Sequence, residues 1–377
     1  MKSILIITHC TSNTGAPKIC LSVINFFRNY YPQYKIDVLS LDSGGTLEPK
    51  FIELSDNYYP IDKLSKEPIY SIENRIKLKL FGKKIFSEYQ EQINNLILNK
   101  YSLIYANTIV SLDIAVKIKS SNDIKIVLYL LEMNTVIDQL CSSFSNKISA
   151  IDSVCFISKF HRKHIENYYN LQFTNYSELI PPIQVNIESN LDNIKKDSIV
   201  NIVMVGSVHW RKGDDIFIQI ARKIISKRNN VHFYWIGPMD FYHEKIIQND
   251  INRLGINDRV KFVGEVENPL SMLKDMDIFI LTSREEPFGL APAEAGMIGL
   301  PIIYFKDVTG IGALLEENNL DLSIPYLDID TMETVLLDLI DNSQKRELLG
   351  AKTKLILEKY NEQKFWIEFK ETVIDIL

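Results

Sequence analysis

Short apolar runs alternate with amphipathic segments along the whole chain, and this alternation constrains the fold more than any other feature. In the first half, runs typical of buried strands occupy residues 4–8, 35–41, 103–106, 124–130 and 153–157. In the second half they occupy residues 199–206, 231–236, 260–263, 278–281 and 302–305. The segments between them, such as 15–29, repeat apolar residues with helical periodicity. The pattern predicts successive βαβ units and therefore an α/β protein with parallel sheets.

The length of 377 residues is enough for two domains of ordinary size. A polar stretch with several Asn, Asp and Lys residues follows Pro181 and Pro182. We therefore expect a first domain over 1–183, a linker over 184–199 and a second domain over 200–360. The chain closes with an amphipathic segment over 361–377, which we expect to be a helix.

Two glutamates, Glu286 and Glu294, stand eight residues apart in the second half. On one continuous helix they would lie about 80° apart, and Gly289 interrupts the stretch between them. We expect a loop that carries Glu286 and enters a short helix near Pro292, with Glu294 in the first turn and Gly299 at the end. The backbone N–H groups and the dipole of that helix would then face a ligand.

The sequence Glu286-Pro-Phe-Gly, followed by Glu294, resembles the signature of retaining glycosyltransferases of family 4, which have the GT-B fold. The resemblance implies two Rossmann-like α/β domains whose parallel sheets face each other across an interdomain cleft. It also implies that the closing helix packs back on the first domain. Glu286 and the N–H groups of Phe288, Gly289 and Leu290 would contact the donor sugar and its diphosphate. Glu294 would bind the ribose hydroxyls.

The strand at 199–206 ends in Gly206-Ser207-Val-His-Trp-Arg211-Lys212-Gly. By the same resemblance, Gly206 and Ser207 lie on the donor side, and Arg211 and Lys212 neutralise the diphosphate through charge-assisted hydrogen bonds. Relatives often carry an arginine where this chain has Ser207, so we expect Arg211 to supply the second positive charge. The alternative interpretation is an ordinary exposed Arg-Lys turn.

The loop after the first strand carries Gly15 and Ala16 at the start of a helix. It resembles the glycine-rich loop that packs against the donor diphosphate in the family, although one glycine replaces the usual pair. A tight turn between strand and helix explains the same residues and is compatible with phosphate binding at a helix N-terminus.

Other polar residues of the first domain follow predicted strands, where ligands of open α/β sheets bind. On this basis we expect an acceptor-side group made of His9, Asn13, Asn107 and Glu132. Many relatives have a histidine that contacts the donor sugar where this chain has Leu131. For Glu132, a structural glutamate held in a salt bridge is the alternative.

The remaining histidines and the cysteines predict no metal centre. We expect His161 and His164 on an exposed helix, and we find no cluster with metal-ligand spacing. The four cysteines show no C-x-x-C spacing and are expected to be free thiols. We therefore expect no metal and no cofactor besides a nucleotide-sugar co-substrate, such as a UDP-, GDP- or dTDP-sugar.

Charge and hydropathy bear on where the protein acts. The net charge of −6 argues against a nucleic-acid surface spread over the whole molecule. The first apolar run is too short for a signal peptide, and no run approaches a membrane span, so we expect a cytoplasmic protein. The basic segment from Arg75 to Phe86 is either a solvated helix or a face that contacts anionic lipid at the inner membrane.

By its resemblance to family 4, the chain is expected to be a retaining, metal-independent glycosyltransferase. It would move a sugar from a nucleotide-sugar to a hydroxyl of a glycan or lipid-linked acceptor, in the synthesis of surface polysaccharide, lipopolysaccharide or another glycoconjugate. A sugar-nucleotide epimerase or a non-catalytic partner subunit of the same fold are the alternatives. A nicotinamide-dependent dehydrogenase is disfavoured, because no G-x-G-x-x-G follows either leading strand.

Overall fold

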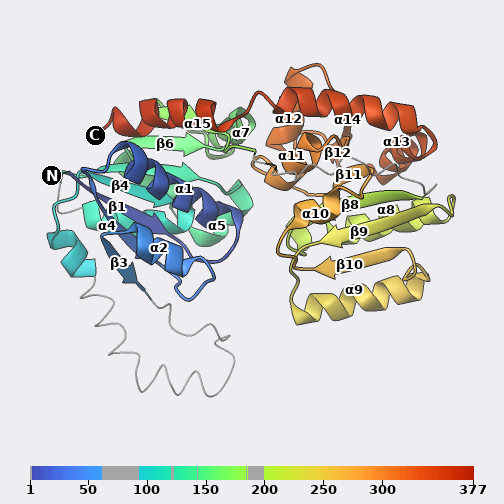
Figure 1. The fold of residues 1–377 in the computed structure, drawn as a ribbon, viewed down its shortest axis with the longest axis horizontal. Coiled ribbons are helices and arrows are strands. Elements are labelled where there is room, and N and C mark those ends of the chain that lie inside the picture. Colours follow the sequence, from blue (N-terminus) through green and yellow to red (C-terminus); the bar gives the residue numbers. More distant parts are fainter. Residues whose placement is uncertain (1, 62–92, 120–122, 142, 184, 186–198) are drawn as a thin grey trace, which may run out of the picture. The chain divides into compact units, whose positions relative to one another are not determined.

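The computed structural model describes residues 2–61, 93–119, 123–141, 143–183, 185 and 199–377. The chain forms two compact units, one made of Met1–Leu179 with Phe365–Leu377 and the other of Ile180–Lys364. Each unit contains a parallel sheet flanked by helices (Figure 1). The C-terminal segment therefore belongs to the unit formed by the N-terminal half, which we call unit 1; the other is unit 2.

In the described part of unit 1, seven strands form one parallel sheet in the order β3-β2-β1-β4-β5-β6-β7. The strands are β1 (Ser3–Thr8), β2 (Lys35–Ser40), β3 (Asn57–Pro60), β4 (Leu103–Asn107), β5 (Lys125–Leu130), β6 (Ser153–Phe156) and β7 (Tyr176–Glu178). The order of the strands reverses between β1 and β4. In open α/β sheets, ligands bind beyond the carboxyl ends of the strands at such a reversal.

Helices cover this sheet with apolar faces. They are α1 (Gly15–Tyr30), α2 (Glu48–Leu54), α4 (Leu112–Lys119), α5 (Asn134–Leu140), α6 (Phe144–Lys147), α7 (Lys159–Tyr169) and α15 (Glu362–Phe369), with one-turn segments η1 (Ile109–Ser111), η2 (Ile148–Ala150) and η4 (Lys370–Ile374). The C-terminal helix α15 packs on α1, because the ring of Trp366 stacks on Phe26 with centroids 4.7 Å apart. Phe369 reaches Tyr105 of β4, with ring centroids 6.1 Å apart.

Unit 2 contains a second parallel sheet, whose six described strands run in the order β10-β9-β8-β11-β12-β13. They are β8 (Val200–Val205), β9 (Val231–Ile236), β10 (Val260–Gly264), β11 (Ile278–Leu281), β12 (Ile302–Phe305) and β13 (Ser323–Ile324). Here the strand order reverses between β8 and β11. The segments that leave these two strands carry the basic turn and the Glu286 loop.

The helices of unit 2 are α8 (Asp214–Ile225), α9 (Phe241–Leu254), α10 (Pro269–Leu273), α11 (Leu290–Met297), α12 (Gly310–Glu317), α13 (Ile329–Asp341) and α14 (Ser343–Leu357), with the one-turn segment η3 (Trp210–Lys212). Helix α8 anchors to the sheet through Phe217, whose ring lies edge-on to Trp235 with centroids 5.2 Å apart. Helix α9 begins where the side chain of Asp240 accepts hydrogen bonds from two backbone N–H groups and ends at Gly255, which has a positive φ of 65°.

The predicted α/β architecture with parallel sheets is confirmed, and the predicted strands are present with ends within one residue of the expected bounds. Strands β3, β7 and β13 were not predicted, because they are short edge strands with few apolar residues. The segment from Arg75 to Phe86 and nearly all of the predicted linker at 184–199 lie outside the described residues. Across the ranges described above, no helix is both long and apolar enough to cross a bilayer.

Candidate active site

The strongest candidate site in unit 2 is built from two segments at the reversal of strand order. The turn η3 follows β8, and the loop from Thr282 to Gly289 follows β11. Backbone carbonyls of the turn accept hydrogen bonds from the loop. The Thr282 hydroxyl donates to the carbonyl of Lys212 over 2.8 Å, and the backbone N–H of Arg284 donates to the carbonyl of Arg211, also over 2.8 Å. The two segments therefore form one connected structure.

A glycine allows this close approach. Gly213 ends the turn with φ of 74°, in the left-handed region that favours glycine. A Cβ at this position would lie 2.2 Å from the carbonyl oxygen of Thr282, so any side chain would push the turn away from the loop.

Three of the predicted residues meet in a charged cluster. The Lys212 ammonium contacts the Glu286 carboxylate directly, and their side chains are only 14% and 12% exposed. The Arg211 guanidinium lies 3.9 Å from the same carboxylate oxygen and donates to the carbonyl of Glu285 over 3.1 Å. The cluster carries two cations and one anion, so it has a net positive charge that suits an anionic ligand.

Burial and neighbouring charges shift the pKa values of this cluster. Burial lowers the pKa of Lys212, and the attraction of Glu286 opposes that effect. Burial by itself would raise the pKa of Glu286, but Lys212 and Arg211 outweigh it and hold the pKa below its usual value. The Glu286 carboxylate is therefore ionised near neutral pH. The neighbouring His209 has a pKa lowered to about 4, by burial and then by Arg211 and Lys212, so it is neutral there.

The loop that carries Glu286 is fixed by its backbone. The backbone N–H of Glu286 donates to the carbonyl of Val308 over 2.7 Å, and the buried side chain of Phe288 anchors the next turn. Gly289 precedes α11 with φ of 99°, where a Cβ would meet the ring of Pro292 at 2.8 Å. Among the described residues, the N–H groups of Phe288, Gly289 and Leu290 have no hydrogen-bond partner. Free N–H groups before a helix N-terminus are suited to binding an anion.

Helix α11 differs from the prediction at one point. It begins at Leu290, so Glu294 lies in its second turn and not in its first. The prediction placed the start too late because it relied on Pro292. The end was predicted correctly, since Gly299 has φ of 92° and its N–H donates to the carbonyl of Gly296 over 2.9 Å. Glu294 is half-buried on this helix.

The two other predicted donor-side residues of unit 2 lie at the end of β8. The carbonyl of Gly206 accepts a hydrogen bond from the Trp235 indole over 2.7 Å. A Cβ on Gly206 would lie 3.4 Å from the Lys212 side chain, so this glycine borders the charged cluster. Ser207 is exposed beside it.

In unit 1, the predicted residues gather at the corresponding edge of the sheet. Asn107 is fully buried, and its amide donates to the carbonyl of Ala16 at the start of α1 over 3.0 Å. Asn13 is exposed in the preceding loop, and Gly15 is exposed at the first position of α1. The adjacent Thr108 has φ of 81° and ψ of 159°, a combination that is strained for any residue except glycine.

Glu132 is tied to the backbone rather than to a cation. One carboxylate oxygen accepts hydrogen bonds from the N–H groups of Ile109 and Leu131, over 3.1 and 3.0 Å. In the described part of the chain no cation lies within ion-pair distance of it, so the salt-bridge alternative is not observed. Burial raises the pKa of Glu132, against the lowering effect of these hydrogen bonds and of the nearby His9.

The prediction of an exposed helix around His161 was wrong. Helix α7 is present, but His161 is 0% exposed and its Nε2 lies 2.8 Å from the carbonyl oxygen of Glu132. Burial lowers the pKa of His161 to about 4. His164 is half-buried, and its Nε2 lies 2.6 Å from the Asn134 side chain. Basic neighbours in the sequence suggested a solvated face, whereas the ring packs edge-on against Phe156.

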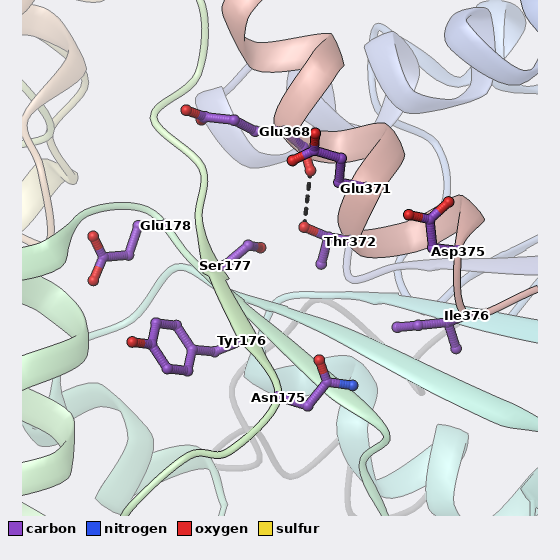
Figure 2. A pocket seen from close by; sticks show the side chains of 9 residues that line it. All are labelled: Asn175, Tyr176, Ser177, Glu178, Glu368, Glu371, Thr372, Asp375 and Ile376. Atoms are coloured by element: carbon purple, nitrogen blue, oxygen red, sulfur yellow. Dashed lines mark hydrogen bonds between the residues drawn. The ribbon is translucent and has the colours of Figure 1, made fainter.

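A cavity of about 580 Å³ lies elsewhere in unit 1, between the edge strand β7 and the C-terminal helix. Figure 2 shows Glu178, Glu368, Glu371 and Asp375 around it, with the Thr372 hydroxyl bonded to the carbonyl of Glu368. None of the predicted site residues lines this cavity. Its four carboxylates are unsuited to a diphosphate, because like charges repel.

The sequence did not single out the residues that hold the basic turn in place. Thr282 and Arg284 stand directly after β11, and Asp215 stands in the first turn of α8. Their polar character at a strand end and a helix start was the available signal. Among the described residues, no group of three or more His, Cys, Asp or Glu side chains is arranged to hold a metal ion. Metal independence therefore stays a prediction.

Comparisons with known proteins cover the part of the chain that contains this cluster. Residues 200–342, which include the whole charged cluster, match the family described as "Glycosyl transferases group 1". The capsular polysaccharide biosynthesis glycosyltransferase CapM of Staphylococcus aureus is 26% identical over 185 residues, covering 49% of this chain and 48% of CapM. The lipopolysaccharide core biosynthesis mannosyltransferase LpsB of Rhizobium meliloti is 30% identical over 114 residues, covering 29% and 31%. The matched region spans about half of CapM and about a third of LpsB.

Solved structures show the same fold over the whole chain. The structure of Anabaena HepE in complex with UDP and glucose has a TM-score of 0.76 at 16% identity, covering 100% of both chains. WaaG, a glycosyltransferase involved in lipopolysaccharide biosynthesis, has a TM-score of 0.69 at 13% identity, covering 99% of both chains. The chain therefore has the GT-B fold, with two Rossmann-like domains, and the predicted fold class is confirmed.

Proposed function

We infer that this protein is a glycosyltransferase that moves a hexosyl group from a nucleotide-sugar to a hydroxyl acceptor with retention of configuration. The observation that carries this inference is the joined turn and loop of unit 2, where Arg211, Lys212 and Glu286 meet beside the free N–H groups before α11. The match of residues 200–342 to group 1 glycosyltransferases supports it independently.

The cluster suits a leaving nucleoside diphosphate. When the bond between the anomeric carbon and the β-phosphate oxygen breaks, negative charge grows on that oxygen. Arg211, Lys212 and the N–H groups of Gly289 and Leu290 would stabilise this charge, as fixed donors do in a site of low dielectric constant. These donors do not require a metal ion. The Glu286 carboxylate would position the sugar and stabilise the positive charge that develops on its ring.

The rest of the donor would extend over neighbouring residues of unit 2. Glu294 on α11 would bind the ribose hydroxyls, and Gly206 with Ser207 would border the phosphates. This assigns nucleotide binding to the domain predicted at 200–360. Gly15 and Ala16 of unit 1 would add N–H groups at the start of α1.

The acceptor molecule would be bound by polar residues of unit 1, namely His9, Asn13, Asn107 and Glu132, and would bring the reacting hydroxyl. Its oxygen would form the new bond to the anomeric carbon from the side that the phosphate leaves, and its proton would pass to the leaving phosphate oxygen. This scheme needs no carboxylate as a covalent nucleophile. Because the new bond forms on the side that the phosphate leaves, the configuration is retained.

The relatives suggest the setting. CapM and LpsB act in capsule and lipopolysaccharide synthesis, and the HepE structure contains UDP. A glycan or lipid-linked acceptor for surface polysaccharide, made at the cytoplasmic face of a membrane, fits these names. Contact with the membrane through the Arg75 to Phe86 segment stays a prediction.

The test incubates the full chain with UDP-, GDP- and dTDP-sugars and measures nucleoside diphosphate release with and without glycan acceptors, in buffer containing EDTA. A transferase releases the diphosphate fastest with an acceptor, and nuclear magnetic resonance of the product shows the same anomer as the donor. An epimerase would instead return a rearranged nucleotide-sugar without an acceptor. Absence of any turnover or nucleotide binding would favour the partner-subunit alternative.

A further inference from the structure

One arginine outside the predicted site residues contacts both the basic turn and the helix that follows it. Arg284 follows β11 and its side chain is 13% exposed. Its guanidinium donates to the carbonyl of Trp210 over 2.6 Å and forms a two-bond pair with the carboxylate of Asp215, over 3.0 and 2.9 Å. It also lies over the Trp210 ring, 4.8 Å from the centroid. A guanidinium is planar and rigid, so these contacts fix its orientation.

Contacts from Arg284 and its neighbour Thr282 satisfy all three backbone carbonyls of the turn. The carbonyl of Trp210 accepts from the guanidinium of Arg284, and that of Arg211 accepts from the backbone N–H of the same residue. The carbonyl of Lys212 accepts from Thr282. Asp215 links the guanidinium to the first turn of α8, the helix that directly follows the turn. The direction in which Arg211 and Lys212 leave the backbone therefore depends on Arg284.

We propose that Arg284 is a positioning residue for diphosphate recognition: it holds the turn so that Arg211 and Lys212 present their charges to the two phosphates of the donor. This assignment rests on the proposed function. It acts through the geometry of the turn, and it also neutralises Asp215, which would otherwise repel the phosphates. Lysine cannot replace it, because one ammonium cannot bridge both carboxylate oxygens and the Trp210 carbonyl in the same plane.

The experiment measures the dissociation constants of UDP and UMP by calorimetry for the full-length wild type and for Arg284→Lys. The ratio of the two constants reports recognition of the second phosphate and not the general condition of the site. We expect Arg284→Lys to weaken UDP binding about tenfold and UMP binding only about twofold, with an unchanged melting temperature. Asp215→Asn, which releases the guanidinium without removing it, should reduce the preference for UDP in the same direction.

Arg228→Lys is a matched control. Arg228 also makes a two-bond pair with an aspartate, Asp341, over 2.9 and 2.6 Å. It lies beyond the far end of α8, a helix length of roughly 18 Å from the site. Its replacement should leave both dissociation constants unchanged.

Three results would overturn the assignment. Arg284→Lys could bind UDP as the wild type does, or it could weaken UDP and UMP by one common factor, which would indicate a general structural role. If Arg284→Lys does not fold, a normal UDP preference in Asp215→Asn has the same meaning. If the wild type binds neither UDP, GDP nor dTDP, the proposed function itself fails, and that result is distinct because it appears before any substitution is made.

Discussion

The two units place different chemistry at the same structural position, the carboxyl edge of a parallel sheet where the strand order reverses. In unit 2 this edge holds a charged cluster of Arg211, Lys212 and Glu286. In unit 1 it holds the neutral side chain of Asn107, while the carboxylate of Glu132 is turned onto backbone N–H groups. Topology thus fixes where a ligand can bind, and the side chains decide which kind. The charged cluster of unit 2 suits an anion, whereas binding of the acceptor hydroxyl by unit 1 stays a proposal.

The largest expected effect comes from removing Lys212 from the charged cluster of unit 2. Lys212→Ala should weaken UDP binding about a hundredfold, because truncating one partner of a desolvated charge pair costs about 2–5 kcal/mol. It also leaves Glu286 without the neighbour that lowers its pKa. Calorimetric titration with UDP measures the loss.

A control separates this effect from the general loss of a lysine. Lys223 of α8 also pairs with carboxylates, Asp330 at 2.7 Å and Glu333 at 3.0 Å, but its side chain is 41% exposed. Lys223→Ala should bind UDP like the wild type. If Lys212→Ala bound UDP as tightly as the wild type, the charged cluster would not be part of the donor site.

The second effect concerns how the stability of unit 1 depends on pH through the buried His161. His161 has a pKa of about 4 when folded, against about 6.5 when unfolded, so the unfolded chain binds the extra proton first as the pH falls. The stability that depends on neutral His161 is present above about pH 6.5 and is lost towards pH 4. Between pH 7 and pH 5 the loss should be about 2 kcal/mol for the cooperative unit that contains this residue.

His161→Gln keeps a donor for the carbonyl of Glu132 but does not titrate. Urea unfolding at pH 7 and pH 5 should therefore show a smaller pH dependence in this variant, even if it is less stable at pH 7. An identical pH dependence in the variant and the wild type would contradict the account of a neutral buried ring.

A third, smaller effect tests whether Glu294 binds the ribose hydroxyls of the donor. Glu294→Ala should weaken UDP binding about tenfold, because hydrogen bonds to a charged group contribute about 1.5–3 kcal/mol. The wild type should prefer UDP to its 2′,3′-dideoxy analogue, whereas the variant should bind both alike. A variant that keeps this preference would show that the ribose hydroxyls bind elsewhere.

The smallest effect should separate the two units by function. Glu132→Gln retains an oxygen that can accept from Ile109 and Leu131, so the fold should persist. We expect unchanged UDP binding and about a threefold rise in the KM for the acceptor, because Glu132 is proposed to lie on the acceptor side. Steady-state kinetics with a fixed donor measures it. A change in donor affinity instead would break the division between the units.

Much of the secondary structure could be predicted from the sequence, because it depends on residues that are close together in the chain. The strands followed from apolar runs, and the end of α11 from Gly299. The meeting of Lys212 with Glu286, which are 74 positions apart, followed only from family resemblance. The contacts of Arg284 were not predicted, because its partners Trp210 and Asp215 are distant in sequence. The burial of His161 was missed because its basic neighbours hid the apolar pattern of α7.

The basic turn and the Glu286 loop of unit 2 are proposed to bind the diphosphate of a nucleotide-sugar. A crystal structure of the full chain with UDP tests it most directly. We predict phosphate oxygens within hydrogen-bond distance of Arg211, Lys212 and the N–H groups before α11. An ordered UDP whose phosphates contact none of these groups would contradict the account.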